Sequence, residues 1–85
     1  MKKVVIYTGP LCGYCDAAKA LLKKKNISFD EIDIGENQKK KDEMLKKSNG
    51  AQTIPQIFIG NNHIGGFHQL YALEKENKLD GLLKN

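Results

Sequence analysis

The sequence predicts an α/β domain in which helices cover both faces of one mixed, four-stranded sheet. Two observations lead to this prediction. Short β-branched runs alternate with longer segments of helical periodicity, and the first run is almost continuously apolar, which is typical of a buried central strand. The expected element order is β-α-β-α-β-β-α-α, with the first two strands parallel and joined by a right-handed crossover. A chain of 85 residues is expected to form a single domain, residues 1–85, because a core of this size cannot be divided.

The first half of the chain is expected to contain two strands and a helix. Residues 3–8 form the apolar strand, which Gly9-Pro10 ends. Residues 13–25 place apolar side chains at helical spacing with lysines on the opposite face, and Asn26 ends this helix. Residues 28–34 alternate apolar and polar side chains, which is typical of a strand with one solvated face.

The second half begins with a strongly charged segment, residues 36–49, in which helix-forming residues dominate and Gly50 stands at the expected C-cap. Residues 56–59 form a third strand. Turn residues connect it to a short fourth strand at 63–64, so these two strands form a hairpin. The remaining elements are two helices, one opened by Gly65-Gly66 and one around residues 79–83.

Composition and charge argue against several classes of function. The net charge of +4 comes from 14 lysines and no arginine against 10 acids, and the lysine runs are interleaved with Asp and Glu on predicted helices. This pattern is typical of solvated helix faces, whereas nucleic-acid binders concentrate positive charge and use arginine. No apolar run is long enough to span a bilayer, and the first residues do not resemble a signal peptide. We therefore expect a cytoplasmic protein with no nucleic-acid or membrane partner, whose two cysteines are not a structural disulfide.

The clearest chemical signal is Cys12-Gly13-Tyr14-Cys15, which follows a predicted strand and begins a helix. The nucleophile in disulfide exchange is the thiolate, and an ordinary thiol of pKa about 8.5 is mostly protonated at neutral pH. The first turn of a helix offers unpaired N–H groups and the positive end of the helix dipole, and both favour the anion. We therefore predict that Cys12 is the attacking group and that Cys15, one turn further on and more buried, is the resolving thiol.

Two other interpretations of the cysteines compete with this one. A zinc site could combine Cys12 and Cys15 with His63 and His68, but 47 residues separate the two pairs, against about 12–15 in a zinc finger. Two inert core cysteines are also conceivable, but a C-x-x-C motif at a strand-to-helix junction is a poor match to core filling. No metal ligands are therefore assigned.

Two further segments have a chemical interpretation beside an ordinary structural one. A cis Ile54–Pro55 bond would leave the Ile54 N–H and C=O free to pair with an extended peptide, although a strand-initiating proline is an equal alternative. Gly65-Gly66 stands before Phe67-His68 at a predicted helix start. Glycines there allow close approach of a ligand, and the helix N–H groups can hold a carboxylate, although any helix can start with glycine.

Taken in order, these segments make the chain resemble a short bacterial dithiol glutaredoxin over essentially its whole length. The resemblance is carried by Tyr7-Thr8, Cys12-Gly13-Tyr14-Cys15, residues 53–59 and residues 63–67. It implies a thioredoxin-like fold with Pro55 in the cis form, and an enzyme that uses glutathione as cosubstrate to reduce protein disulfides and glutathione mixed disulfides. The implied partners are glutathione and disulfide-containing or glutathionylated proteins, in electron transport and cell redox homeostasis. A monomer is expected.

The resemblance also implies a glutathione site. The Ile54 backbone would pair with the cysteinyl part of glutathione, and the N–H groups of Gly66 and Phe67 would hold its γ-glutamyl carboxylate. The other residues that would line or flank the site are Tyr14, Lys41, Thr53, Pro55 and His68.

Several positions depart from the family pattern. Gly13 replaces the usual proline between the cysteines, and a small residue here sometimes accompanies a [2Fe-2S] cluster held between two subunits and two glutathiones. Cluster binding or transfer by a glutathione-bridged dimer is therefore the alternative function. Gly9 replaces a family lysine, which leaves Lys41 as a substitute cation, and His68 replaces an acid that would contact the γ-glutamyl amine. Asp16 should slightly oppose thiolate formation. From these departures together we expect weaker glutathione binding than in typical members. A thioredoxin-like donor that ignores glutathione is a third hypothesis.

Overall fold

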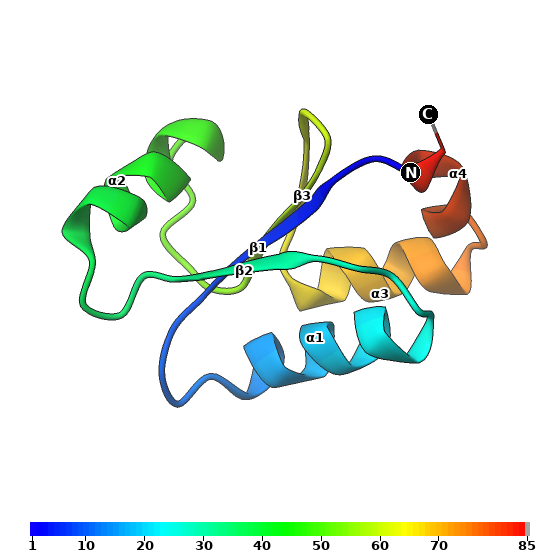
Figure 1. Cartoon of the computed structure of the whole chain (residues 1–85), viewed down its shortest axis with the longest axis horizontal. Helices are drawn as coiled ribbons and strands as arrows, with labels where there is room; N and C mark the ends of the chain where they lie inside the picture. The colour runs from blue at the N-terminus through cyan, green and yellow to red at the C-terminus, as the bar shows by residue number, and fades with distance from the viewer. Residues whose placement is uncertain (85) are drawn as a thin grey trace.

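The computed structural model of the chain describes residues 1–84 and contains one four-stranded sheet in the order β2-β1-β3-β4 (Figure 1). β1 pairs with β2 in parallel, whereas β1 with β3 and β3 with β4 are antiparallel pairs. The strands are β1 (Val4–Thr8), β2 (Asp30–Asp33), β3 (Gln56–Ile59) and β4 (Asn62–Gly65). The predicted mixed sheet, its parallel first pair and the final hairpin are therefore confirmed.

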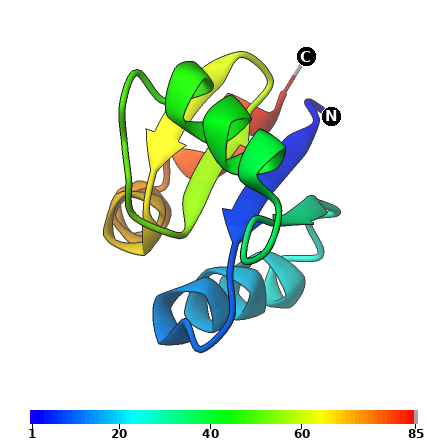
Figure 2. The same ribbon diagram turned by 90° about the vertical axis from the view of Figure 1, so that its left-hand side faces the viewer.

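Helices cover both faces of the sheet, as predicted. α1 (Gly13–Lys24) and α3 (Phe67–Lys75) lie side by side on one face, and α2 (Gln38–Lys47) lies on the other (Figure 2). α4 (Leu79–Leu83) belongs to the face of α1 and α3, because both of its terminal leucines are buried in the same apolar cluster. In the described part of the chain, no helix is both long and apolar enough to cross a bilayer.

The two central strands, β1 and β3, are buried on both faces because their side chains alternate between two apolar cores. Ile6 and Ile57 belong to the larger core, beside α1, α3 and α4. Tyr7 and Phe58 meet Met44 of α2 in the smaller core, where their two rings pack edge to face with centroids 5.6 Å apart. This double burial explains why the sequences of these strands are almost continuously apolar.

The predicted boundaries lie within one residue of those in the structure, except in the second helix and the second strand, which differ by two. The second helix spans Gln38–Lys47 rather than 36–49. The Asn37 side chain caps its start by accepting a first-turn N–H at 3.1 Å, and Asn49, with a left-handed backbone (φ 59°), ends it before Gly50. The second strand begins at Asp30 rather than 28, because its pairing with β1 begins there.

A partly buried hydrogen bond ties α2 to the sheet. The Tyr7 hydroxyl donates to Glu43 Oε2 at 2.6 Å, and Tyr7 is fully buried. Burial, together with the adjacent Glu43 carboxylate, raises the pKa of Tyr7. The hydrogen bond from Tyr7 is the largest of the effects that lower the pKa of Glu43. The phenol and the carboxylate therefore stabilise the fold in their protonated and ionised forms, respectively.

We expect Tyr7→Phe to lower the free energy of unfolding at neutral pH by about 1–3 kcal/mol, because the carboxylate loses its buried donor while the ring remains. The folded-state pKa of Glu43 lies below its ordinary value of 4.5. Its contribution is therefore present above that value and is lost as the pH falls through the folded-state pKa.

In Tyr7→Phe, the free energy of unfolding should therefore fall less between neutral and acidic pH than in the unchanged protein. Urea unfolding at a series of pH values measures this difference. Tyr71→Phe, which removes a hydroxyl on the exposed face of α3, is the matched control. It should change neither the free energy of unfolding at neutral pH nor its dependence on pH. An acid profile of Tyr7→Phe parallel to that of the unchanged protein would contradict this role for the hydrogen bond.

Candidate active site

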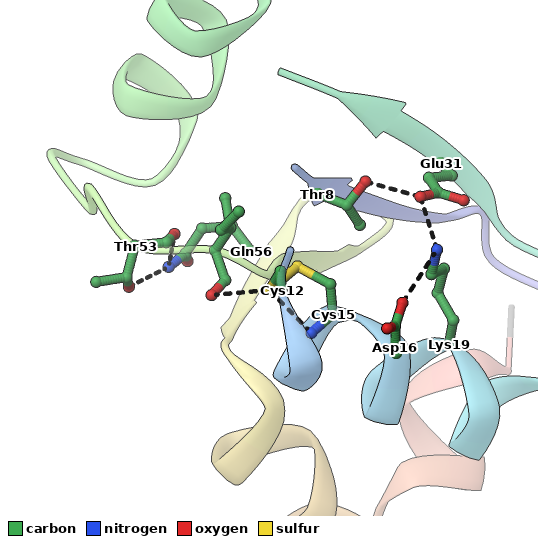
Figure 3. Close-up of a disulfide and its surroundings, with 9 residues drawn as sticks. Thr8, Cys12, Cys15, Asp16, Lys19, Glu31, Thr53 and Gln56 are labelled. Carbon is green, nitrogen blue, oxygen red and sulfur yellow. Dashed lines mark hydrogen bonds and ion pairs between the residues drawn. A yellow bond between two sulfur atoms is a disulfide. The ribbon is translucent and has the colours of Figure 1, made fainter. Parts of the chain in front are cut away.

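The two cysteines lie at the start of α1, beyond the end of β1 (Figure 3). They form a disulfide, with their Cα atoms 5.2 Å apart. Cys12 is the N-cap of the helix, and its Sγ accepts the N–H of Cys15 at 3.1 Å. Cys12 is partly exposed, whereas Cys15 is buried. An amide at this position can stabilise a sulfur anion, and the partial exposure of Cys12 leaves its sulfur accessible.

The loop before β3 lies against the cysteines. Its Ile54–Pro55 peptide bond is cis, as the resemblance implied, and Ile54 O lies 3.8 Å from Cys12 Sγ. Within residues 1–84, the Ile54 N–H has no hydrogen-bond acceptor. The Ile54 backbone is therefore available to pair with an extended peptide beside the sulfur.

Gln56, the first residue of β3, holds this loop in place. Its buried side chain donates from Nε2 to Thr53 O at 2.9 Å and to Thr53 Oγ1 at 3.2 Å (Figure 3). On β4, His63 Nε2 lies 2.6 Å from Gln56 Oε1. Because this oxygen can only accept, His63 must carry a proton on Nε2 to make the bond. Three side chains thus form a chain of hydrogen bonds that supports the loop facing Cys12.

A groove of about 550 Å³ runs along this loop and the start of α3. Tyr14 and Phe67 stack along it with ring centroids 6.0 Å apart, and the exposed His68 meets Tyr14 edge-on at 5.0 Å. Seven of the eight residues expected to bind glutathione line this groove: Tyr14, Thr53, Ile54, Pro55, Gly66, Phe67 and His68.

Lys41, the eighth, lines a second hollow of about 450 Å³ that shares Ile54 with the groove. Gly9 lines the same hollow, and its lack of a side chain has a steric reason. A Cβ at this position would lie 2.7 Å from Ile54 Cδ1. A lysine here, as in the family pattern, would require Ile54 to move. Of the residues that line this hollow, Lys41 is the cation and Glu36 is the acid.

The start of α3 presents amide donors to the groove. Gly65 turns the chain from β4 into the helix with φ 116°, a conformation that favours glycine. The Gly66 N–H already donates to Gln69 Oε1 at 2.9 Å. A ligand that binds the Gly66 amide must therefore displace the Gln69 side chain.

A charged cluster lies on the side of the cysteines away from Thr53 and Gln56 (Figure 3). Glu31 Oε2 accepts from Thr8 Oγ1 at 2.7 Å and from Lys19 Nζ at 2.9 Å, and Lys19 Nζ is also 3.9 Å from Asp16 Oδ1. The hydrogen bond from Lys19, followed by that from Thr8, lowers the pKa of Glu31, and the bond to Glu31 raises the pKa of Lys19. Lys19 thus offsets part of the Asp16 charge, which weakens the expected opposition of Asp16 to the thiolate.

The zinc alternative finds no support in this geometry. In the part of the chain that the structure describes, no three His, Cys, Asp or Glu side chains converge on a possible metal position. His63 instead bonds to Gln56, and His68 packs on Tyr14.

Sequence reasoning missed two glutamines of the site. Gln56 carried a usable signal, because a polar residue at the start of an otherwise apolar strand needs partners once it is buried. Gln69 follows Gly66 by three residues, which is the spacing of a helix-capping glutamine.

We expect Gly9→Ala to lower the free energy of unfolding by about 1–2 kcal/mol, because the added methyl group meets Ile54 Cδ1. Ile54→Val removes that carbon at a cost of about 0.5–1.5 kcal/mol, so the penalty of alanine should largely disappear in the double variant. A double-mutant cycle by urea unfolding measures the coupling. Gly13→Ala, whose Cβ would meet nothing within 4 Å, is the control and should show no coupling to Ile54. Strictly additive losses for Gly9→Ala and Ile54→Val would show that Ile54 is not the obstacle.

Several known proteins are similar to this chain in sequence and in structure. The family profile named Glutaredoxin matches residues 4–64. Glutaredoxin 3 of Escherichia coli (strain K12) is 52% identical over 84 residues, which cover 99% of this chain and 100% of the relative. A crystal structure of a buckwheat glutaredoxin–glutathione complex matches with a TM-score of 0.85 at 25% identity, covering 96% of this chain and 76% of that chain. A structure from work on "Metal Binding of Glutaredoxins" matches with a TM-score of 0.75 at 53% identity, covering 100% and 91%. The chain therefore belongs to the glutaredoxin family of thiol–disulfide oxidoreductases, with a thioredoxin-like fold and a redox-active cysteine pair.

Proposed function

We propose that the chain is a glutathione-dependent oxidoreductase that reduces glutathione mixed disulfides and protein disulfides, with Cys12 as nucleophile and Cys15 as resolving thiol. The position of Cys12 Sγ carries this proposal. The sulfur accepts the Cys15 N–H at 3.1 Å and lies 3.8 Å from Ile54 O. A sulfur that is stabilised as an anion and set beside an unpaired backbone segment can both bind and attack a peptide disulfide.

The reaction is a series of thiol–disulfide exchanges. The Cys12 thiolate attacks the glutathione sulfur of a mixed disulfide, forms a Cys12–glutathione disulfide and releases the other thiolate, which takes a proton from water. The thiolate of a second glutathione then attacks this disulfide, which yields oxidised glutathione and restores Cys12. In the other branch, Cys15 loses its proton and attacks Cys12, which releases glutathione and forms the Cys12–Cys15 disulfide. Two glutathiones reduce that disulfide, and a separate NADPH-linked reductase regenerates them.

Glutathione would bind with its cysteinyl part along Ile54 and its two carboxylates toward opposite ends of the site. The γ-glutamyl carboxylate fits the start of α3, where the Gly66 and Phe67 amides bind it once Gln69 has released Gly66. The glycyl carboxylate fits the second hollow, beside the Lys41 ammonium. The buckwheat relative, solved as a glutathione complex, supports this class of ligand.

The proposed partners are glutathione and disulfide-containing or glutathionylated proteins. Because the cycle consumes reduced glutathione, we place it in the cytoplasm, where thiols are kept reduced. We propose that the chain acts as a monomer. Lysines on the helices pair with acids, as Lys19, Lys25 and Lys40 do, so no nucleic-acid or membrane partner is proposed.

A second candidate function is [2Fe-2S] cluster binding or transfer by a glutathione-bridged dimer, and Gly13 favours it. A cluster takes four ligands, usually thiolates, so two Cys12 thiolates and two glutathiones would complete the set. Gly13 leaves the surface beside Cys12 open, since a Cβ there would meet nothing within 4 Å. The related structure from work on metal binding of glutaredoxins supports a metal-related role.

We expect Cys12→Ser to reduce turnover of the glutathione–mercaptoethanol mixed disulfide to the uncatalysed rate, because no thiolate remains at the helix start. Cys15→Ser should retain this turnover and lose the reduction of protein disulfides, which needs the resolving thiol. NADPH consumption coupled to glutathione reductase measures both activities, with glutathione titrated in the Cys15→Ser protein. Full activity in Cys12→Ser would overturn the assignment. Reduction of the unchanged protein by thioredoxin reductase but not by glutathione would identify the third hypothesis, a thioredoxin-like donor.

Anaerobic incubation with iron, sulfide and glutathione tests the second candidate. The protein should develop visible absorbance and elute as a dimer in gel filtration. Gly13→Pro should lose both signals, because the proline ring stiffens the first helical turn beside Cys12. The helix itself should persist, because Gly13 is its first residue and proline is tolerated there. Gly81→Ala, at an equally open position on α4, is the control. A colourless monomer from the unchanged protein would remove this candidate.

A further inference from the structure

Leu11 combines a left-handed backbone with an exposed side chain, and both conditions are unfavourable for leucine. It is fully exposed, and its φ of 52° lies in the left-handed region. Within residues 1–84, the other non-glycine residues with a left-handed backbone are three asparagines that follow helix ends, Asn26, Asn49 and Asn77. Asparagine tolerates this conformation, whereas leucine is disfavoured in it. Leu11 therefore costs backbone stability and recovers none by packing, a combination that points to a function.

The position of Leu11 relates it to the reaction. It directly precedes Cys12, and consecutive Cα atoms are about 3.8 Å apart, so its side chain stands beside the attacking cysteine. Leu11 lines neither the groove at Tyr14 nor the hollow at Lys41. Under the proposed function, the glutathione half of a mixed disulfide occupies those two hollows. Leu11 is then left to face the other half, the protein that is released.

We propose that Leu11 is a specificity residue for protein substrates and contacts an apolar side chain next to the substrate's reactive cysteine. This inference rests on the proposed function and adds the chemistry of its partner. When the Cys12 thiolate attacks, the Cys12–glutathione bond forms, the bond from glutathione to the protein breaks, and the protein leaves as a thiolate. Throughout this step, the residues next to the substrate cysteine lie close to residue 11.

An apolar partner side chain matches the surface around Cys12. Four large apolar side chains of the described chain are exposed, and two of them, Leu11 and Tyr14, flank Cys12 in the sequence. An exposed leucine that is not packed in its own chain is available to a partner, and burying it against an apolar side chain contributes to binding.

Two glutathionylated peptides test the proposal, identical except for leucine or serine before the modified cysteine. The unchanged protein should prefer the leucine peptide in kcat/KM. In Leu11→Asn and Leu11→Gly, this preference should fall roughly tenfold, the effect of losing one apolar contact, relative to turnover of the glutathione–mercaptoethanol disulfide. Leu11→Met, which keeps an apolar side chain, should retain the preference.

The stability of the same variants gives a second readout. Leu11→Asn should raise the Tm by a few degrees, on the order of 4 °C, because the left-handed backbone is relieved. The reciprocal change Asn26→Leu should lower the Tm and leave the peptide preference unaltered. A Leu11→Asn protein that is less stable than the parent would overturn the strain argument.

The remaining outcomes separate this inference from the proposed function. If Leu11→Asn keeps the peptide preference, or loses turnover of the small disulfide in equal proportion, the inference is overturned while the proposed function stands. If the unchanged protein does not turn over the small disulfide, the proposed function fails and the inference fails with it. If sedimentation shows a dimer that Leu11→Asn dissociates, the occupant is a second copy of the chain and the inference is overturned.

Discussion

Burial of β1 and β3 between two layers of helices is the constraint on which the active site depends. Ile6 and Ile57 enter one core while Tyr7 and Phe58 enter the other, so a shift of one residue in register would exchange the two sets. The loop that leaves β1 and the loop that enters β3 therefore end at fixed positions. Through these loops the sheet brings Cys12 Sγ to 3.8 Å from Ile54 O, although the two residues are 42 positions apart in the sequence.

The group that donates a hydrogen bond to Cys12 Sγ is a backbone amide. The Cys15 N–H bonds to Cys12 Sγ, whereas Lys19, a lysine of the same helix, is engaged by Glu31. Position 9 is a glycine and carries no cation, and a Cβ there would lie 2.7 Å from Ile54 Cδ1. Amides held in a helix do not reorganise when a thiolate forms, and they need no mobile charged side chain to stabilise it.

The chain follows local conformational rules where it only folds and departs from them beside the reactive sulfur. Asparagines, which tolerate the left-handed backbone, follow the ends of α1, α2 and α3. The buried Gln56 has both polar atoms of its side chain bonded. Leu11 breaks the first of these rules immediately before Cys12. Local departures of this kind are expected at functional sites, where stability is exchanged for activity.

The sequence by itself determined the eight elements, their order and the mixed sheet, because apolar periodicity and turn residues are local signals. It also identified Cys12 and Cys15, since a C-x-x-C pair at a strand-to-helix junction has a chemical meaning without further context. Only the tertiary structure decided that His63 supports Gln56 and that a side chain at position 9 would meet Ile54 Cδ1. Whether such contacts form depends on differences of tenths of an ångström between segments that the fold brings together. Such distances depend on how helices and strands pack, and local propensity carries no information about packing.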